Sequence, residues 1–226
     1  LTSLNLSNFD TSKVTNMGHM FDNATFLKSL DLSNFDTSNV TDMSYMFSNI
    51  YNLDLFIFSN FDTSKVKDMS YMFYAVHFIT SLNLSNFDTS NVTDMSYMFS
   101  SIYSLASLDL SNFNTTNVTN MSSMFFYVHS LTSLDLSNFD TSQVTDMQYM
   151  FSLNDNDISK DKLETIYVNN DFNTAKLTSF VGMFENRKRL RGGNNSFLAG
   201  PSTADKSWLR IDDPAHGRPG YFTRKP

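Results

Sequence analysis

Residues 1–21 read LTSLNLSNFDTSKVTNMGHMF, and residues 27–47 repeat the pattern as LKSLDLSNFDTSNVTDMSYMF. The Met-Phe pair that ends each copy recurs every 26 residues, at Met20, Met46, Met72, Met98, Met124 and Met150. A seventh, diverged copy, LETIYVNNDFNTAKLTSFVGMF, ends at Met183-Phe184, 33 residues after the sixth pair, because SLNDNDISKDK is inserted at 152–162. A fixed period of this length is typical of solenoids, in which neighbouring units bury a shared core.

Each copy predicts one strand and one short helical turn. Leu4 and Leu6 alternate with polar residues, the pattern of a strand with one buried face. Val14, Met17, Met20 and Phe21 follow a helical or 3₁₀ spacing, and the hydroxyls of Thr11-Ser12 in front are suited to capping it. We therefore expect an α/β repeat solenoid, with a parallel sheet on one face and short helices or 3₁₀ turns on the other.

The distribution of loop residues predicts the domain organisation. All four Pro and five of the seven Gly lie after residue 190, so the C-terminal segment is built differently from the repeats. Its aromatic and aliphatic residues are suited to covering the last hydrophobic coil. We expect six repeats over 1–151, an inserted loop over 152–162, a diverged seventh repeat over 163–191 and a C-terminal cap over 192–226.

Composition and charge restrict the classes of function. The chain has 226 residues, 41% of them hydrophobic, and no Cys, which excludes disulfides and thiolate chemistry. Residues 1–151 hold four Lys and no Arg against fourteen Asp, a formal charge of −10. An acidic body argues against nucleic acid as a partner. No apolar stretch is long enough to predict membrane insertion.

The repeats, together with LRGGN, WLRIDD and PGYFT near the C-terminus, resemble the BspA-type leucine-rich-repeat surface proteins. Their repeats occur in lactobacilli and mycoplasmas among others. The resemblance implies a right-handed leucine-rich-repeat coil in a secreted, wall-attached or lipid-anchored bacterial protein. It also implies adhesion to a host surface protein or glycan: a matrix protein, mucin, a sulfated glycan or an epithelial receptor. The export and anchoring signals are expected outside this segment, which we expect to be monomeric.

The outward side chains of the strands are expected to line the concave face of the solenoid. One outward column contains Asp31, Ile57, Asn83 and Asp109, and the preceding column has Leu55 between serines. Leu55 and Ile57 are adjacent aliphatic residues on a polar face, which favours a partner-binding anchor. Sequence drift, or a register slip that turns both residues inward, remains an alternative.

Two further columns are rich in aromatic residues. In the connectors between repeats, Tyr51, His77, Tyr103 and His129 alternate. They are suited to stacking on sugars or contacting protein, with a response to mild acid through His, or to packing edge to face along the rod. Another column consists of His19, Tyr45, Tyr71, Tyr97, Ser123 and Tyr149, to which the same two interpretations apply.

Charged clusters give weaker hypotheses. Arg187, Lys188, Arg189 and Arg191 are suited to a polyanion such as teichoic acid or a sulfated glycan, or to a solvated or cap-pairing role. The Asp column that begins at Asp10 predicts helix capping rather than calcium sites. Residues 155–161 begin a calcium-loop spacing, but Lys160 stands where the turn requires Gly. We expect no metal site and no cofactor.

A catalytic site requires different groups that converge on one point, whereas repeats place identical groups in rows. The four His are scattered, and no nucleophile elbow or phosphate loop occurs. A β-helical polysaccharide lyase is the strongest enzyme alternative, but the body lacks a suitable basic residue. The sequence predicts a non-catalytic adhesin fragment, with a passive stalk of a larger wall-attached protein as the alternative.

Overall fold

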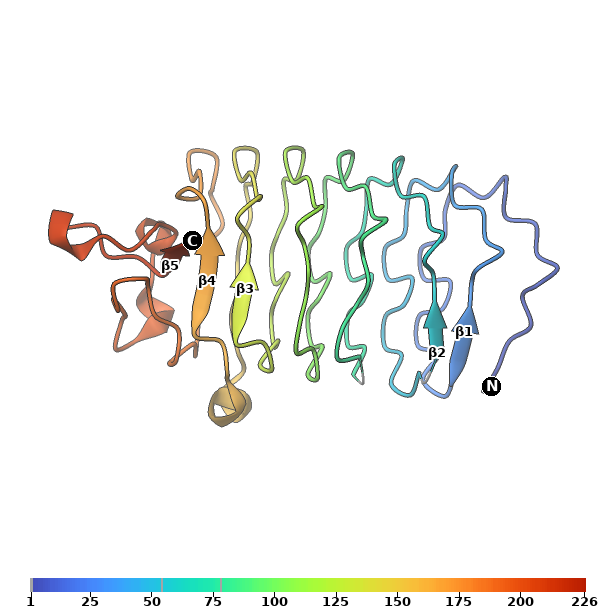
Figure 1. Cartoon of the computed structure of the whole chain (residues 1–226), viewed down its shortest axis with the longest axis horizontal. Helices are drawn as coiled ribbons and strands as arrows, with labels where there is room; N and C mark the ends of the chain where they lie inside the picture. Colours follow the sequence, from blue (N-terminus) through green and yellow to red (C-terminus); the bar gives the residue numbers. More distant parts are fainter. Residues whose placement is uncertain (1, 54, 78) are drawn as a thin grey trace.

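The computed structural model describes residues 2–53, 55–77 and 79–226. Successive coils lie side by side along one axis, and the chain ends in a less regular segment beside β4 (Figure 1). The strands are β1 Ser29–Asp31, β2 Leu55–Ile57, β3 Ser133–Asp135, β4 Thr165–Val168 and β5 Phe222–Arg224. The 3₁₀ helices are η1 Asp155–Lys160, η2 Pro201–Thr203, η3 Lys206–Trp208 and η4 Pro214–His216. All of these helices follow residue 151, so the described part of the six repeats contains turns and strands without a helix.

One side of the stack, here called the strand face, carries two short parallel sheets. β1 pairs with β2, with Ser29 opposite Leu55, so the pairing follows the 26-residue period. β3, β4 and β5 form the second sheet. Residues 79–83 and 105–109 hold no strand, although we expected one in each coil. The break follows the third coil, where Phe56 and Phe58 take the places of the buried Leu side chains of the neighbouring coils.

The opposite side, here called the turn side, differs from the expected helices. Met17, His19 and Phe21 donate their N–H groups to the carbonyls of Asp42, Ser44 and Met46 in the next coil, at 2.9–3.0 Å. A helix would direct these N–H groups to its own carbonyls. In each of the first five coils two residues four positions apart have a positive φ, for example 56° at Tyr45 and 57° at Asn49, so the backbone alternates in hand and forms successive turns. The apolar spacing that predicted a helix therefore belongs to a stack of turns.

Each junction from the first to the seventh coil has four such hydrogen bonds on the turn side. A column of isolated parallel bridges runs along the same side, through Asn16, Asp42, Asp68, Asp94, Asn120, Asp146 and Ser179. The turn side is thus hydrogen-bonded without interruption over the whole stack.

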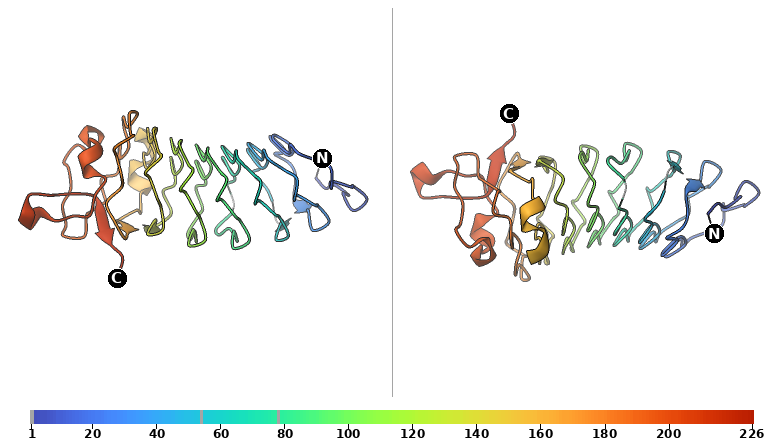
Figure 2. Two further views of the ribbon diagram at one scale, coloured as in Figure 1. Left: turned by 90° about the horizontal axis from the view of Figure 1, so that it is seen from above. Right: turned by 90° about the horizontal axis from the view of Figure 1, so that it is seen from below.

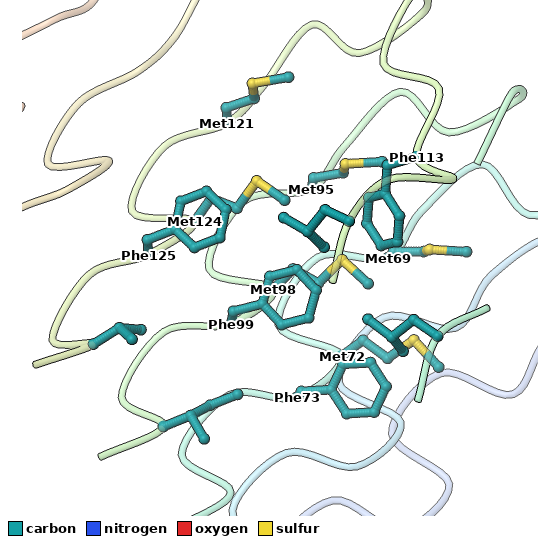
Figure 3. Packing of buried hydrophobic residues seen from close by; sticks show 14 of the residues in the cluster. Met69, Met72, Phe73, Met95, Met98, Phe99, Phe113, Met121, Met124 and Phe125 are labelled. Atoms are coloured by element: carbon teal, nitrogen blue, oxygen red, sulfur yellow. The ribbon is translucent and has the colours of Figure 1, made fainter. Parts of the chain in front are cut away.

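Methionine and phenylalanine fill the core. The pairs Met72-Phe73, Met98-Phe99 and Met124-Phe125 of three successive coils follow one another through the core (Figure 3). Phe73, Phe99 and Phe125 are at most 1% exposed, and their ring centroids are 5.9–6.0 Å apart. Flexible Met side chains fill the space between such rings. Because the coils after the first bury the same Met and Phe columns, one core runs through the molecule.

Buried polar side chains link the coils near the sharp bend after the SNF motif. The Thr37 hydroxyl donates to the Asp62 carbonyl at 2.9 Å and accepts the Asp62 N–H at 2.8 Å. The Asn60 amide donates to the Phe35 carbonyl at 2.8 Å. The threonines therefore satisfy backbone groups of the following coil, instead of capping a helix in their own coil as we expected.

The insertion and the cap complete the C-terminal end. The insertion forms η1, with Asn154 as its N-cap, rather than the irregular loop that we expected. β5 of the cap pairs with β4, and the Tyr221 ring lies 4.7 Å from Phe184 of the last Met-Phe pair. The views from above and below show the cap closing this end (Figure 2). The cap therefore covers the last hydrophobic coil.

The first coil has no such cover in the described structure. Its Phe9 is 56% exposed, whereas the equivalent residues further along are buried or half-buried, and Phe26 in the connector that follows is 71% exposed. Among the described residues, none of the helices has the length and apolar character needed to cross a bilayer.

Candidate functional site

The predicted polar residues of the strand face lie at the surface. Asp31, Asn83 and Asp109 are exposed. Each accepts the N–H of the serine two residues later, at 2.9–3.2 Å, in a local turn that ends the strand segment. Hydrogen bonds from Ser33 hold the pKa of Asp31 below its usual value, and those from Ser111 do the same for the pKa of Asp109. These residues thus shape the backbone as well as facing solvent.

The third coil differs from its neighbours on this face. Ile57 is half-buried and lies opposite the exposed Asp31, so the register-slip alternative is wrong. The backbone of Leu55 lies opposite Ser29, whereas its side chain lies outside the described residues. Phe56 and Phe58 face the core, and the Phe56 ring lies 4.7 Å from Phe47 with its edge toward it.

A hollow of about 450 Å³ opens beside Ile57, between the third and fourth coils. It is lined by Leu53, Phe56, Ile57, Phe58, Ser59, Ile79, Thr80, Ser81, Leu82 and Asn83. The hollow combines apolar walls with hydroxyl and amide groups, which is the composition of a binding site for another molecule. The sequence predicted an anchor at Ile57 but not a hollow, because the space between coils depends on how the Phe rings pack.

The connector column is a stack of rings. The ring of His77 lies 4.6 Å from those of Tyr51 and Tyr103, and the rings of Tyr103 and His129 are parallel at 5.4 Å. The predicted edge-to-face packing is wrong for these pairs, because their faces cover one another. All four side chains are half-buried. Burial lowers the pKa of His77 and of His129, so both rings remain neutral at pH 7.

The second aromatic column stacks more closely. The centroids of His19 and Tyr45 are 4.4 Å apart, and the steps from Tyr45 to Tyr71 and from Tyr71 to Tyr97 are 4.3 Å. All of these residues have φ between 56° and 58°, a left-handed conformation that is unusual for aromatic residues. Burial raises the pKa of Tyr45 and Tyr71. The shared backbone geometry of the turn side holds these rings in line.

The basic cluster is not one surface. Arg187 is 1% exposed and donates to Asp161 at 2.7 Å and to the carbonyls of Val128 and Phe151. The prediction that Arg187 contacts a polyanion is therefore wrong, because its guanidinium lies inside the protein. Arg189 pairs with Glu164, and Arg191 lies 4.3 Å above the Phe197 ring.

Lys188 is exposed at the surface. No cluster of His, Cys, Asp or Glu suited to a metal ion occurs within the described residues. In the segment where calcium was considered, Asp157 pairs with Lys160 at 2.6 Å and Asp161 pairs with Arg187. These carboxylates are engaged by cations of the chain itself.

Stacked 26-residue coils with one continuous core place the chain among the repeat proteins. The chain belongs to the family described as "Mycoplasma protein of unknown function, DUF285", whose model matches residues 2–100, 49–161 and 104–199. The three matches overlap and cover the repeats, while most of the cap lies beyond them. No curated protein and no solved structure matches the sequence.

Proposed function

We propose that the chain is a BspA-type leucine-rich-repeat solenoid, coiled in the right-handed sense, from an extracellular bacterial surface protein. It acts without catalysis or cofactor, as an adhesin that binds a host surface protein or glycan through its repeats. The family match and the stacked coils support this proposal. The acidic body is consistent with a partner other than nucleic acid.

The observation that carries the proposal is the hollow beside Ile57. In the other five of the six repeats the residue at this position is Asp or Asn, and Asp31 and Asp109 are exposed. At the third coil an aliphatic side chain borders a hollow of about 450 Å³. A partner that fills this space removes apolar surface from water, which is the main source of affinity in most interfaces.

The variant Ile57→Asp tests this site, because it gives the third coil the residue found at this position in the second, fifth and sixth coils. Asn5→Asp adds the same charge to the same column in the first coil and serves as the control. Binding is measured by surface plasmon resonance to immobilised mucin, fibronectin, fibrinogen, collagen, sulfated glycans and epithelial membranes. We expect saturable binding to one ligand, weakened about tenfold or more by Ile57→Asp and unchanged by Asn5→Asp. Equal binding by both variants would exclude the hollow as the adhesive site.

The alternative function is a passive stalk that holds other domains away from the cell. The uninterrupted hydrogen bonding of the turn side favours it, because four bonds at every junction join the coils into a rod. A fragment that binds no ligand of the panel, at pH 4.5 or at pH 7, would favour the stalk over the adhesin.

A further inference from the structure

A slot interrupts the second aromatic column, here called the tyrosine column, on the turn side. The column has an aromatic ring in each of the first four coils and again in the sixth, but Ser123 takes this place in the fifth. Ser123 has φ of 54° and is 2% exposed, so the backbone continues unchanged and a small side chain lies at the floor. Tyr97 and Tyr149 flank it from the coils on either side.

The two flanking rings are two coils apart, which is roughly 10 Å at the usual spacing of parallel strands. Rings in the intact part of the column stack at 4.3–4.4 Å, so the position that lacks a ring at Ser123 has the spacing of one planar group. Gly182 of the seventh coil leaves room for the Tyr149 ring. A Cβ on Gly182 would lie 2.5 Å from the Tyr149 ring, so this ring occupies the space that a side chain at 182 would take.

The slot forms a pocket of about 380 Å³. It is lined by Tyr97, Ser123, Phe126, Tyr149, Ser152, Leu153, Asn154, Asp155, Glu185 and Asn186. The lining thus has three aromatic rings and two carboxylates, without Lys, Arg or His. The Asn186 amide donates to the Leu153 carbonyl and to Asp155, both at 2.9 Å, so its N–H groups are already engaged.

We propose that this pocket binds a planar cation, the guanidinium group of an arginine in a partner polypeptide. A guanidinium is flat on both faces, and it stacks on aromatic rings by cation–π attraction. It carries five N–H donors and no acceptor, which matches the carboxylates of Asp155 and Glu185 in the lining. The formal charge of −10 over residues 1–151 also attracts a positively charged partner.

A neutral sugar ring would also meet aromatic walls, but it would gain nothing from the charge of the two carboxylates. A lysine would satisfy the charge but lacks a planar group to place between the rings. A neutral sugar and a lysine are therefore the competing ligands that the experiment compares with arginine. The slot lies on the turn side and the hollow of the third coil on the strand face, so neither proposal depends on the other.

The experiment is a titration of the whole chain by isothermal calorimetry. The probes are methylguanidinium, a short neutral-ended peptide with one Arg, the same peptide with Lys, and a neutral oligosaccharide. We expect the Arg peptide to bind at least ten times more tightly than the Lys peptide and the oligosaccharide. Absence of heat from the Arg peptide at millimolar concentration would overturn the proposal. So would a Lys peptide or an oligosaccharide that binds as tightly as the Arg peptide.

Two variants locate the binding. Ser123→Tyr fills the slot with the residue found at this position in three preceding coils, where φ is 56–57°, so the fold is retained. His19→Tyr adds a tyrosine at the far end of the same column and is the control. We expect Ser123→Tyr to abolish binding and His19→Tyr to leave it unchanged. The double variant Asp155→Asn with Glu185→Gln should bind the Arg peptide at least ten times more weakly than the wild type does. Wild-type affinity in Ser123→Tyr would show that binding occurs elsewhere.

Discussion

Thr63 illustrates how single side chains join the coils. It is 1% exposed, and its hydroxyl donates to the Asp88 carbonyl and accepts the Asp88 N–H, both at 2.8 Å. The same arrangement recurs along the stack, from Thr11 to Thr115. One buried hydroxyl thus satisfies both a donor and an acceptor of the next coil's backbone.

The variant Thr63→Val keeps the shape of the side chain and removes both hydrogen bonds. Two backbone groups of Asp88 lose their partners, so we expect the free energy of unfolding to fall by about 1–3 kcal/mol. Thr63→Ser keeps the hydroxyl and is the matched control. Urea unfolding followed by circular dichroism measures both. Equal stability of the two variants would mean that the hydroxyl contributes nothing beyond packing.

Arg187 shows what a run of charges in the sequence conceals. Arg187, Lys188 and Arg189 are consecutive and chemically similar, so local composition cannot tell which of them turns inward. The stack decides this, because the carbonyls of Val128 and Phe151 and the carboxylate of Asp161 converge on the position of Arg187. Removal of one partner of such a buried ion pair destabilises the fold strongly, because the other charge stays buried without a counter-charge.

At the scale of the element, the turn after the SNF motif carries the Asp column. The hydroxyl and N–H of Ser12, Ser38 and Ser64 hydrogen-bond the carboxylates two residues earlier and hold the pKa of Asp10, Asp36 and Asp62 below the usual value. Repulsion between Asp36 and Asp10 acts in the opposite direction but is the smaller effect. The hydrogen bonds therefore outweigh the repulsion between stacked carboxylates.

These lowered pKa values predict the pH dependence of stability. A carboxyl group with a lower pKa in the folded state stabilises it fully above the unfolded value of about 3.9, and this contribution is lost as the pH falls through the folded pKa. We expect the melting temperature to decrease from pH 4 to pH 2. The measurement is a series of thermal melts by circular dichroism from pH 7 to pH 2.

The chain provides the control. Asn114 holds the same place in the fifth coil and accepts the Thr116 N–H at 3.1 Å. The triple variant with Asp10, Asp36 and Asp62 changed to Asn should keep the turns and lose part of the acid sensitivity. A melting temperature that rises on acidification from pH 7 to pH 4 would instead show that repulsion dominates.

The repeat spacing was a sufficient guide to which residues pair, as Ser29 with Leu55 shows. It was insufficient for the turn side, because side chains at i, i+3 and i+7 lie on one face in a helix and also in successive turns. The distinguishing property is the hand of the backbone at residues such as Tyr45 and Tyr71. Tyr is not typical of a positive φ, so the sequence gives little warning, although Asn23, Asn49 and Gly182 tolerate this conformation.

The slot at Ser123 was visible in the sequence as an exception in the tyrosine column. Its significance depends on distances that the sequence does not contain: the stacking of the other rings and the position of the Tyr149 ring over Gly182. The hollow beside Ile57 depends in the same way on the packing of Phe56 and Phe58 in the core.

At the scale of the whole molecule, the cap covers the last hydrophobic coil, whereas apolar side chains of the first coil are exposed. The cap buries Phe184 and Tyr221, whereas Phe9 and Phe26 near the other end are exposed. In a stack where each coil contacts its neighbours, an end coil with one neighbour opens more easily than a central coil.

Hydrogen exchange measured by NMR tests this difference between coils. The N–H groups of Met17 and Phe21 make the same bonds as those of Met95 and Phe99 in the fourth coil. We expect the amides of the first coil to exchange faster, because this coil opens without disturbing the rest. Equal protection in the first and fourth coils would indicate that the stack unfolds as a single cooperative unit.

The direction of the hydrogen bonds on the turn side gives the rod an electrical polarity. At every junction the four N–H groups point toward the cap and the four carbonyls that receive them point toward the first coil. At least one backbone bond at each junction runs the opposite way, as from the Thr41 N–H to the Thr15 carbonyl. The peptide dipoles therefore sum to a net polarity along the axis, with the positive end at the cap. The side chains add to this polarity, because residues 1–151 carry a formal charge of −10 while the remainder is basic. The molecule is therefore a long electric dipole, and a charged surface at low ionic strength orients it by one end.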